Sequence, residues 1–179
     1  MLERIAQYFG GGEPDAVALL EQDHKKVKAL FKEFEDAEDG RTKKRIVTTT
    51  IRELIVHATV EEEIFYPAIR GAVEEDKVDE AEEEHHVMEL LIGELQKMKP
   101  SDERYDAKFT VLAESVKHHM EEEESEVFPE AKDKIDGRAL GATMAERKAE
   151  LEQRNGNRAS PRKPKAARRR QSVEKAARV

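Results

Sequence analysis

Two histidine–glutamate pairs at helical spacing are the residues best suited to chemistry in this chain. His57 precedes Glu61 by four residues, and His119 precedes Glu123 by four. Residues four apart lie on one face of a helix, one turn from each other, so each pair directs an imidazole and a carboxylate the same way. This arrangement is typical of a metal-binding site.

Four amphipathic segments with short connections are expected to position these pairs. Apolar residues recur at alternating steps of three and four over residues 14–39, 42–70, 75–99 and 102–136. This repeat is typical of helices that pack in a bundle. The run IVTTTI at 46–51 favours a strand locally, but the bundle repeat continues through it, so we predict a helix. The expected fold is all-α, an antiparallel up-down-up-down four-helix bundle.

A proline follows the histidine of each pair by ten residues. These prolines are Pro67 and Pro129. Proline lacks a backbone N–H and its ring crowds the preceding turn of a helix. We therefore expect the second helix to kink or end at Pro67, and the fourth helix to weaken around Pro129.

Charge divides the chain into an acidic body and a basic tail. The net charge is −8, yet nine Lys and Arg residues after residue 154 face only Glu174, so this segment carries +8 and the body −16. The tail has almost no large apolar residues and cannot offset its ordering entropy. We predict a lead-in at 1–13, the bundle at 14–136, a short accessory helix at 137–154 and a disordered basic tail at 155–179.

The residue types that are missing narrow the classes of function. The chain has no cysteine, which excludes thiolate metal sites, disulfides and a cysteine nucleophile. It has no apolar run of about 18 residues, and its first twelve residues lack a signal-like apolar centre. We therefore expect a soluble, cytoplasmic protein without a membrane partner.

Two further histidines complete an internal repeat. His24 and His85 occupy inward positions of the first and third segments, 33 residues before His57 and 34 before His119. A single inward histidine is more often a hydrogen-bonded core residue than a ligand. Here every segment has one, and burying four imidazoles and two carboxylates without partners costs on the order of several kcal/mol per group. Metal binding is the better explanation.

The ligand types indicate which metals fit. Imidazole with carboxylate suits Fe, Mn or Zn, whereas Cu(I) prefers sulfur ligands. Two neighbouring divalent ions repel each other, and bridging carboxylates offset that repulsion. The expected sets are His24 with His57 for one ion, His85 with His119 for the other, and Glu61 with Glu123 as bridges.

The order His, His-x-x-x-Glu, His, His-x-x-x-Glu, with a proline after each copy, resembles the hemerythrin-like, or HHE cation-binding, domain over about residues 14–135. This resemblance implies a non-haem centre of two iron ions (Fe2+/Fe3+) with an oxo or hydroxo bridge. It also implies binding or sensing of dioxygen, reaction with peroxide or nitric oxide, or reporting of iron. Ferritin-like sites use Glu-x-x-His instead. The iron ligands carried over by matching position are His24, His57, Glu61, His85, His119 and Glu123.

One position departs from the family pattern. Oxygen-carrying hemerythrins have a second histidine one turn after the third-helix ligand, where this chain has Glu89. A carboxylate there either binds an ion and favours its ferric state or leaves a place for water and substrate. We include Glu89 among the predicted ligands, and the departure argues against reversible oxygen carriage.

Other polar residues near the motifs have simpler interpretations. His86 and His118 lie about 100° from their neighbours on the helix and are expected at the surface. Glu126 either supports a ligand imidazole or lies at the wet end of the bundle, and Tyr66 either packs or donates a proton near iron. The acidic residues expected to form solvated faces are Glu62, Glu63, Glu82–Glu84, Glu121, Glu122 and Glu124.

Two hypotheses from different classes follow. The first is a di-iron protein that binds or reacts with dioxygen, peroxide or nitric oxide, and the alternative is an iron- or redox-responsive sensor without turnover. No residue pattern indicates an organic substrate, so enzymatic turnover stays open. The basic cluster at 158–178 is suited to nucleic acid by charge but lacks aromatic residues for base stacking. We prefer a solubilising arm.

Overall fold

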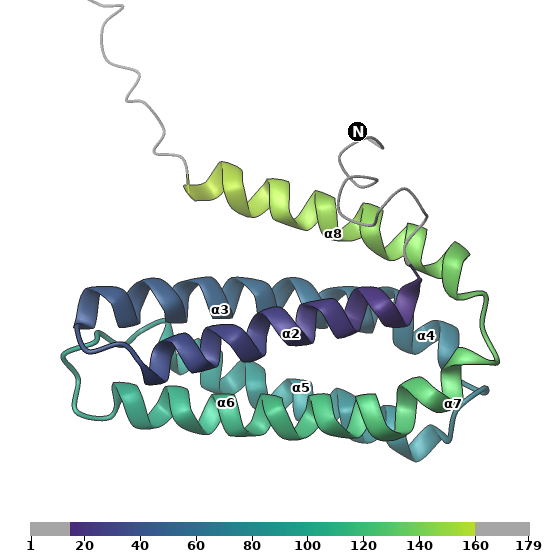
Figure 1. The fold of residues 1–179 in the computed structure, drawn as a ribbon, viewed down its shortest axis with the longest axis horizontal. Coiled ribbons are helices and arrows are strands. Elements are labelled where there is room, and N and C mark those ends of the chain that lie inside the picture. The colour runs from purple at the N-terminus through teal and green to yellow at the C-terminus, as the bar shows by residue number, and fades with distance from the viewer. Residues whose placement is uncertain (1–14, 160–179) are drawn as a thin grey trace, which may run out of the picture.

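The computed structural model describes residues 15–159, with side chains described up to residue 154. Four of its helices form a bundle in which successive helices run antiparallel (Figure 1). The first two pack against each other, as do the last two. The predicted all-α bundle is confirmed, including a helix over 46–51. The four helices are α2 (Ala16–Glu35), α3 (Gly40–Val60), α5 (Glu75–Leu95) and α6 (Tyr105–Glu122).

Aspartates begin the first two helices. The carboxylate of Asp15 accepts hydrogen bonds from two backbone N–H groups in the first turn of α2, and that of Asp39 does the same for α3. Such caps satisfy N–H groups that have no partner within the helix. Asp102 does not cap the fourth helix, because its carboxylate accepts a 2.8 Å bond from the N–H of Lys99 within the connection. That helix begins at Tyr105.

Neither motif-bearing helix ends at its proline. The proline cannot donate a backbone bond and its ring clashes with the carbonyl four residues earlier, so the preceding turn opens into a π turn. Within it, the N–H groups of Tyr66 and Phe128 bond to the carbonyls of Glu61 and Glu123, five residues back. A local widening thus replaces the predicted kink or end. The elements are η1 (Glu61–Phe65) followed by α4 (Tyr66–Ile69), and η2 (Glu123–Val127) followed by α7 (Phe128–Lys132).

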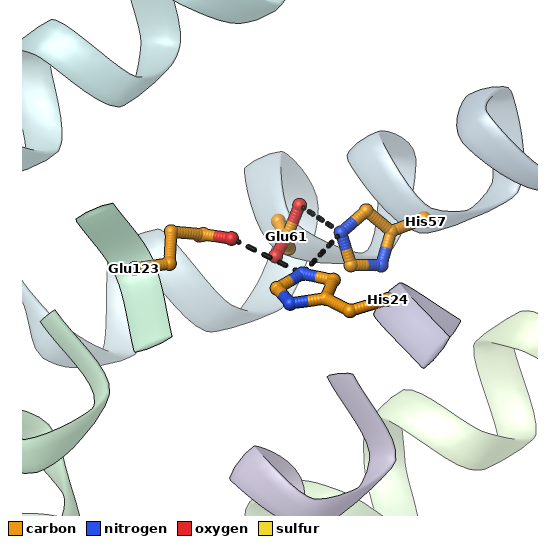
Figure 2. Close-up of side chains that lie close together, drawn as sticks. All are labelled: His24, His57, Glu61 and Glu123. Carbon is orange, nitrogen blue, oxygen red and sulfur yellow. Dashed lines mark hydrogen bonds and ion pairs between the residues drawn. The ribbon is translucent and has the colours of Figure 1, made fainter. Parts of the chain in front are cut away.

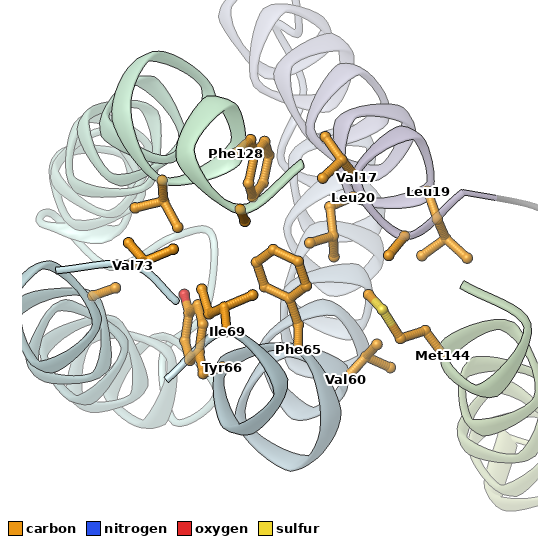
Figure 3. Close-up of a cluster of buried hydrophobic side chains, with 14 of the residues drawn as sticks. Val17, Leu19, Leu20, Val60, Phe65, Tyr66, Ile69, Val73, Phe128 and Met144 are labelled. Atoms are coloured by element: carbon orange, nitrogen blue, oxygen red, sulfur yellow. The ribbon is translucent and has the colours of Figure 1, made fainter. Parts of the chain in front are cut away.

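The buried apolar side chains form two clusters with a polar layer between them. On α2, one cluster contains Leu20 and the other contains Val27, while the buried His24 lies between them. Figure 3 shows the first cluster, in which Phe65 and Phe128 pack edge to face with ring centroids 5.7 Å apart. The two clusters shield the polar layer from both ends of the bundle.

A fifth helix, α8 (Gly137–Ala159), lies along the outer side of α2 and α3 (Figure 1). It continues past the predicted boundary at residue 154, so the first residues of the predicted tail are helical in backbone. The remainder of that tail, 160–179, and the predicted lead-in, 1–13, lie outside the described residues. None of the described helices combines the length and apolar character needed to cross a membrane.

The packing of α8 can be tested at Met144, which is fully buried against Leu20 and Val60 in the first cluster. We expect Met144→Ala to lower the free energy of unfolding by about 2 to 4 kcal/mol, because it leaves a cavity in a packed interface. Urea denaturation followed by circular dichroism measures this change. The matched control is Leu90→Ala at a 59% exposed position, expected to change stability by less than about 0.5 kcal/mol. Equal effects of both variants would contradict the packing of α8.

Candidate metal centre

The structure brings six of the seven predicted ligands together in the polar layer. Their side chains come from different turns of the four bundle helices and their π segments, and each residue is at most 4% exposed. Their ligand role stays a prediction, but their convergence is a structural fact. The six residues are His24, His57, Glu61, His85, His119 and Glu123.

The four imidazoles meet in two pairs. The Nε2 atoms of His24 and His57 lie 3.2 Å apart, and those of His85 and His119 lie 3.0 Å apart. A neutral imidazole carries its proton on only one nitrogen, and the other nitrogen is an acceptor. The location of the protons therefore decides what each pair can bind.

Carboxylates on the outer side of the site fix those protons for three of the histidines. An ionised carboxylate can only accept, so the Nδ1 atom that faces it must donate. In the neutral form of each imidazole, the Nε2 lone pair is then directed inward, toward the other imidazole of the pair. The bonds run from Nδ1 of His24 to Glu124 (2.8 Å), of His85 to Glu62 (2.9 Å) and of His119 to Glu84 (2.8 Å).

Glu61 and Glu123 lie between the two imidazole pairs. Figure 2 shows both of them beside His24 and His57. One oxygen of each carboxylate approaches one histidine of either pair, which is the placement that bridging ligands require. The distances from Oε2 of Glu61 are 3.1 Å to His57 and 3.4 Å to His85, and from Oε2 of Glu123 they are 3.3 Å to His24 and 3.4 Å to His119, all to Nε2.

Unsatisfied polar atoms concentrate in this layer. Among the described residues, the buried side-chain atoms without a hydrogen-bond partner are Nδ1 of His57, both carboxylate oxygens of Glu61 and Oε2 of Glu123. Leaving such a group unpaired costs about 1 to 3 kcal/mol. Inward lone pairs and unpaired carboxylate oxygens together form a donor set that fits divalent cations. Two groups have the required proximity: His24, His57, Glu61 and Glu123 in one, and Glu61, His85 and His119 in the other.

His57 differs from the other three histidines. Its Nδ1 faces the carboxylate of Asp23 at 3.7 Å, which is too long for a hydrogen bond. Lys148 of α8 forms an ion pair with the same carboxylate. Although burial acts to raise the pKa of Asp23, the contacts with His57 and Lys148 outweigh it and lower that pKa. Helix α8 thus contacts Asp23, the residue that faces the predicted ligand His57.

The π turns bring an aromatic ring from each motif toward the site. Because a π turn contains about five residues, Tyr66 follows Glu61 on the same face of the helix, and Phe128 follows Glu123 likewise. The hydroxyl of Tyr66 donates a 2.9 Å hydrogen bond to Oε1 of Glu123. Phe128 stacks on His24 with ring centroids 5.6 Å apart. Phe128 cannot donate to a carboxylate, which is consistent with the unpaired oxygens of Glu61.

Protons compensate the buried charges in the absence of metal. Burial acts to lower the pKa of His85, but hydrogen bonds and attraction from Glu61 and Glu62 outweigh it and raise that pKa to about 10. The pKa of His24 is also raised, because its contacts with Glu123 outweigh burial. Burial acts to raise the pKa of Glu123, yet the surrounding imidazoles lower it strongly. A cation entering this layer would replace protons.

The remaining predicted site residue, Glu89, lies outside both groups. Its side chain is exposed and lines a cavity of about 60 Å³ whose base includes His57, His85 and His119. Glu126 is exposed as well and pairs with Lys77 at 3.4 Å rather than with an imidazole. Glu126 thus lies at the wet end of the bundle, and Glu89 is not part of either converging group.

Of the glutamates expected on solvated faces, Glu62 and Glu124 are exposed and Glu84 is half-buried. All three also accept hydrogen bonds from imidazoles of the central layer, which the sequence did not predict. The repeat contained a signal for them: in each half, the residue before the first histidine and the residue after the glutamate are acidic. These residues are Asp23, Glu62, Glu84 and Glu124. The expectation of exposed His86 and His118 agrees with the structure.

Known proteins share both the sequence pattern and the fold. The family model described as the hemerythrin HHE cation binding domain matches residues 15–131. An uncharacterised hemerythrin-like protein of Schizosaccharomyces pombe is 27% identical over 60% of this chain and 55% of its own length. A protein of Nostoc sp. named DNA nickase is 27% identical over 79% of this chain and 41% of its own length. The chain thus spans about half the length of these relatives, or less.

A solved structure shows the same fold. The crystal structure of a hemerythrin HHE cation binding domain-containing protein from Mycobacterium kansasii superposes with a TM-score of 0.68. It covers 80% of this chain and 88% of its own, at 24% identity. At this identity the likeness supports the helical architecture.

The charge compensation predicts how the stability of the chelator-treated protein depends on pH. The raised pKa values of His24 and His85 stabilise the fold below pH 6.5. The contribution of His85 is lost as pH rises toward its pKa of about 10, and that of His24 as pH rises through its own raised pKa. The lowered pKa of Glu123 stabilises it above pH 4.5 and is lost as pH falls. We expect maximal stability between these values and a loss on the order of 2 kcal/mol by pH 9. Urea midpoints at pH 5.5, 7.5 and 9 test this, and a flat profile would contradict it.

Proposed function

Because this chain belongs to the hemerythrin HHE cation-binding domain family, we propose that it binds two iron ions that bind or react with dioxygen, peroxide or nitric oxide. The observation that carries the proposal is the arrangement of two imidazole pairs around two shared carboxylates. A single ion would leave one imidazole pair with its lone pairs opposed. Two ions use all four nitrogens, and the carboxylates offset the repulsion between the ions.

The proposed ligands are the six converging residues. His24 and His57 would hold one ion and His85 and His119 the other, with Glu61 and Glu123 between them. Imidazole with carboxylate suits iron, and bound iron supplies the electrons for reactions with these small molecules. The outer carboxylates would make the imidazoles better donors by holding the proton on Nδ1.

An apolar cavity beside the imidazoles supports a small, uncharged or weakly polar ligand. Its volume is about 60 Å³, and its walls include Leu54, Met88 and Ile92 with three candidate ligand histidines at the base. Pockets for organic ligands are typically about 300 Å³ or larger. A diatomic molecule or peroxide fits this space, which argues against an organic substrate at the site.

The hydroxyl of Tyr66 is the hydrogen-bond donor that contacts a proposed bridging carboxylate among the described residues. Its hydroxyl holds Oε1 of Glu123, which leaves Oε2 directed at the imidazoles. Burial and the negative charge of Glu123 raise the pKa of Tyr66 well above its usual value. The phenol therefore stays protonated and keeps the carboxylate in one orientation.

The nicking activity in the name of the Nostoc relative belongs to that protein. This chain covers 41% of that relative, and the basic segment that we considered for nucleic acid lies almost wholly outside the described residues. We do not extend that activity to this chain.

Iron content and reactivity test the proposal. We expect anaerobically reconstituted wild-type protein to retain two irons per chain and to gain visible charge-transfer absorption on exposure to oxygen, peroxide or nitric oxide. His85→Ala should retain about one iron, because one imidazole pair is broken. The matched control is His86→Ala, which removes the adjacent exposed histidine and should retain two. Recovery of one zinc ion without redox chemistry would refute the proposal.

The contact between α8 and the site favours a sensor as the second candidate function. Lys148 pairs with Asp23, which faces His57, and Arg147 binds Glu63 at 2.6 Å beside the motif. A metal bound by His57 would fix that imidazole and, through Asp23, one contact of α8. A change in metal occupancy would then change the contact of α8 with the surface of the bundle.

Hydrogen exchange of α8 distinguishes a sensor from an uncoupled helix. We expect iron to slow exchange in α8 by about fivefold, or roughly 1 kcal/mol, and Lys148→Met to remove most of that difference. Lys26→Met is the matched control, because it removes a 2.7 Å ion pair between α2 and α3 without contacting the site. If iron leaves exchange in α8 unchanged in the wild-type protein, the sensor hypothesis should be dropped.

A further inference from the structure

A second cavity connects the central site with a strongly acidic part of the surface. It has a volume of about 130 Å³ and lies between α5 and the η2 end of α6. Its inner end contains the buried His119 and Glu123, and its outer part contains the exposed Glu80 and Glu126. Five of its nine lining residues are glutamates, and Lys77 is the single cationic side chain among them.

A cluster of possible cation ligands lies beside this cavity. Glu84, His118 and Glu122 each offer one ligand atom, and these atoms lie within 4.8 Å of one another. Nε2 of His118 is 3.3 Å from Glu122 and 4.0 Å from Glu84. The imidazole of His118 is 66% exposed, so the cluster is open to hydrated ions.

Glu84 joins this outer cluster to the central site. One of its oxygens faces His118, and the other accepts the 2.8 Å hydrogen bond from Nδ1 of His119. At the inner end of the cavity, Oε2 of Glu123 is buried without a hydrogen-bond partner. Because Glu123 and His119 both line the cavity and both belong to the central site, the cavity leads from the acidic surface to the candidate cation positions.

The charges around the cavity agree with a negative potential inside it. Partial burial and the nearby carboxylate of Glu84 raise the pKa of Glu122. Lys77 bridges the mouth, with Nζ 3.4 Å from Glu126 and 3.7 Å from Glu130. A cleft lined by one sign of charge concentrates ions of the opposite sign and raises their rate of association.

We propose that this cavity is the uptake route for the divalent cations of the central site, and that Glu84, His118 and Glu122 form an outer, transient cation site along it. The inference rests on the proposed function, since it assumes that the central site takes up cations. The chemical class is a hydrated divalent cation such as Fe2+, bound weakly by two carboxylates and one imidazole. The apolar cavity near Glu89 shares only His119 with this cavity, so cations and small molecules would approach the site from different sides.

Uptake kinetics of chelator-treated, full-length protein test the route. We would mix it anaerobically with Co2+, whose visible absorption reports binding to nitrogen and oxygen ligands, and measure both the filling rate and the final stoichiometry. The test variant is His118→Ala with Glu122→Gln. The matched control is His86→Ala with Glu121→Gln, which changes an exposed histidine and an exposed glutamate that do not line the cavity.

The expected result is filling about tenfold slower in the test variant, with the final stoichiometry unchanged and the control at the wild-type rate. Lys77→Gln should speed filling, and added salt should slow it in the wild type, because screening weakens the attraction. Equal rates in test and control variants would overturn the route. A lower final stoichiometry in the test variant would also overturn it, by assigning these residues to the central site. If the wild type binds no cation, the proposed function fails as well. If the wild type binds two cations and the test variant fills at the wild-type rate, only the route is refuted.

Discussion

The structure depends on the opposition of imidazole lone pairs inside a polar layer that two apolar clusters enclose. Three of the four histidines are fixed by outer carboxylates so that Nε2 faces inward, and the paired Nε2 atoms are about 3 Å apart. Two lone pairs at that distance repel unless a proton or metal cation lies between them. Every helix of the bundle therefore contributes to a site that is stable only when positive charge is present.

The same helices must supply apolar side chains to the core of the bundle and polar side chains to the site. Apolar clusters on either side exclude water, which strengthens the electrostatic interactions of the polar layer and raises the cost of an unpaired group within it. The π turns adapt the two motif-bearing helices to both demands, because they pass the proline without ending the helix and direct Tyr66 and Phe128 toward the candidate ligands. Pre-organisation of the site is thus a property of the backbone as well as of the side chains.

Helical periodicity was sufficient to predict the fold and the converging residues, because ligand types recurred at fixed steps in both halves of the chain. Periodicity could not identify Glu62, Glu84 or Glu124, since at ideal helical angles their Cβ atoms point away from the core and only long side chains reach back to a neighbouring helix. It also did not show that Glu89, one turn after His85, has an exposed side chain. The extent of α8 was underestimated because its apolar stripe is thin and its anchors, such as Lys148, are charged.

The pairing of Lys148 with Asp23 makes the two halves of the repeat unequal. His57 is the one histidine of the four whose Nδ1 lacks a carboxylate within hydrogen-bonding distance. Its imidazole is therefore expected to be the weaker electron donor, since a carboxylate partner increases the basicity of a ligand histidine. In the proposed two-ion centre, near-identical motifs would therefore release their cations in a fixed order, with the ion assigned to His24 and His57 leaving first.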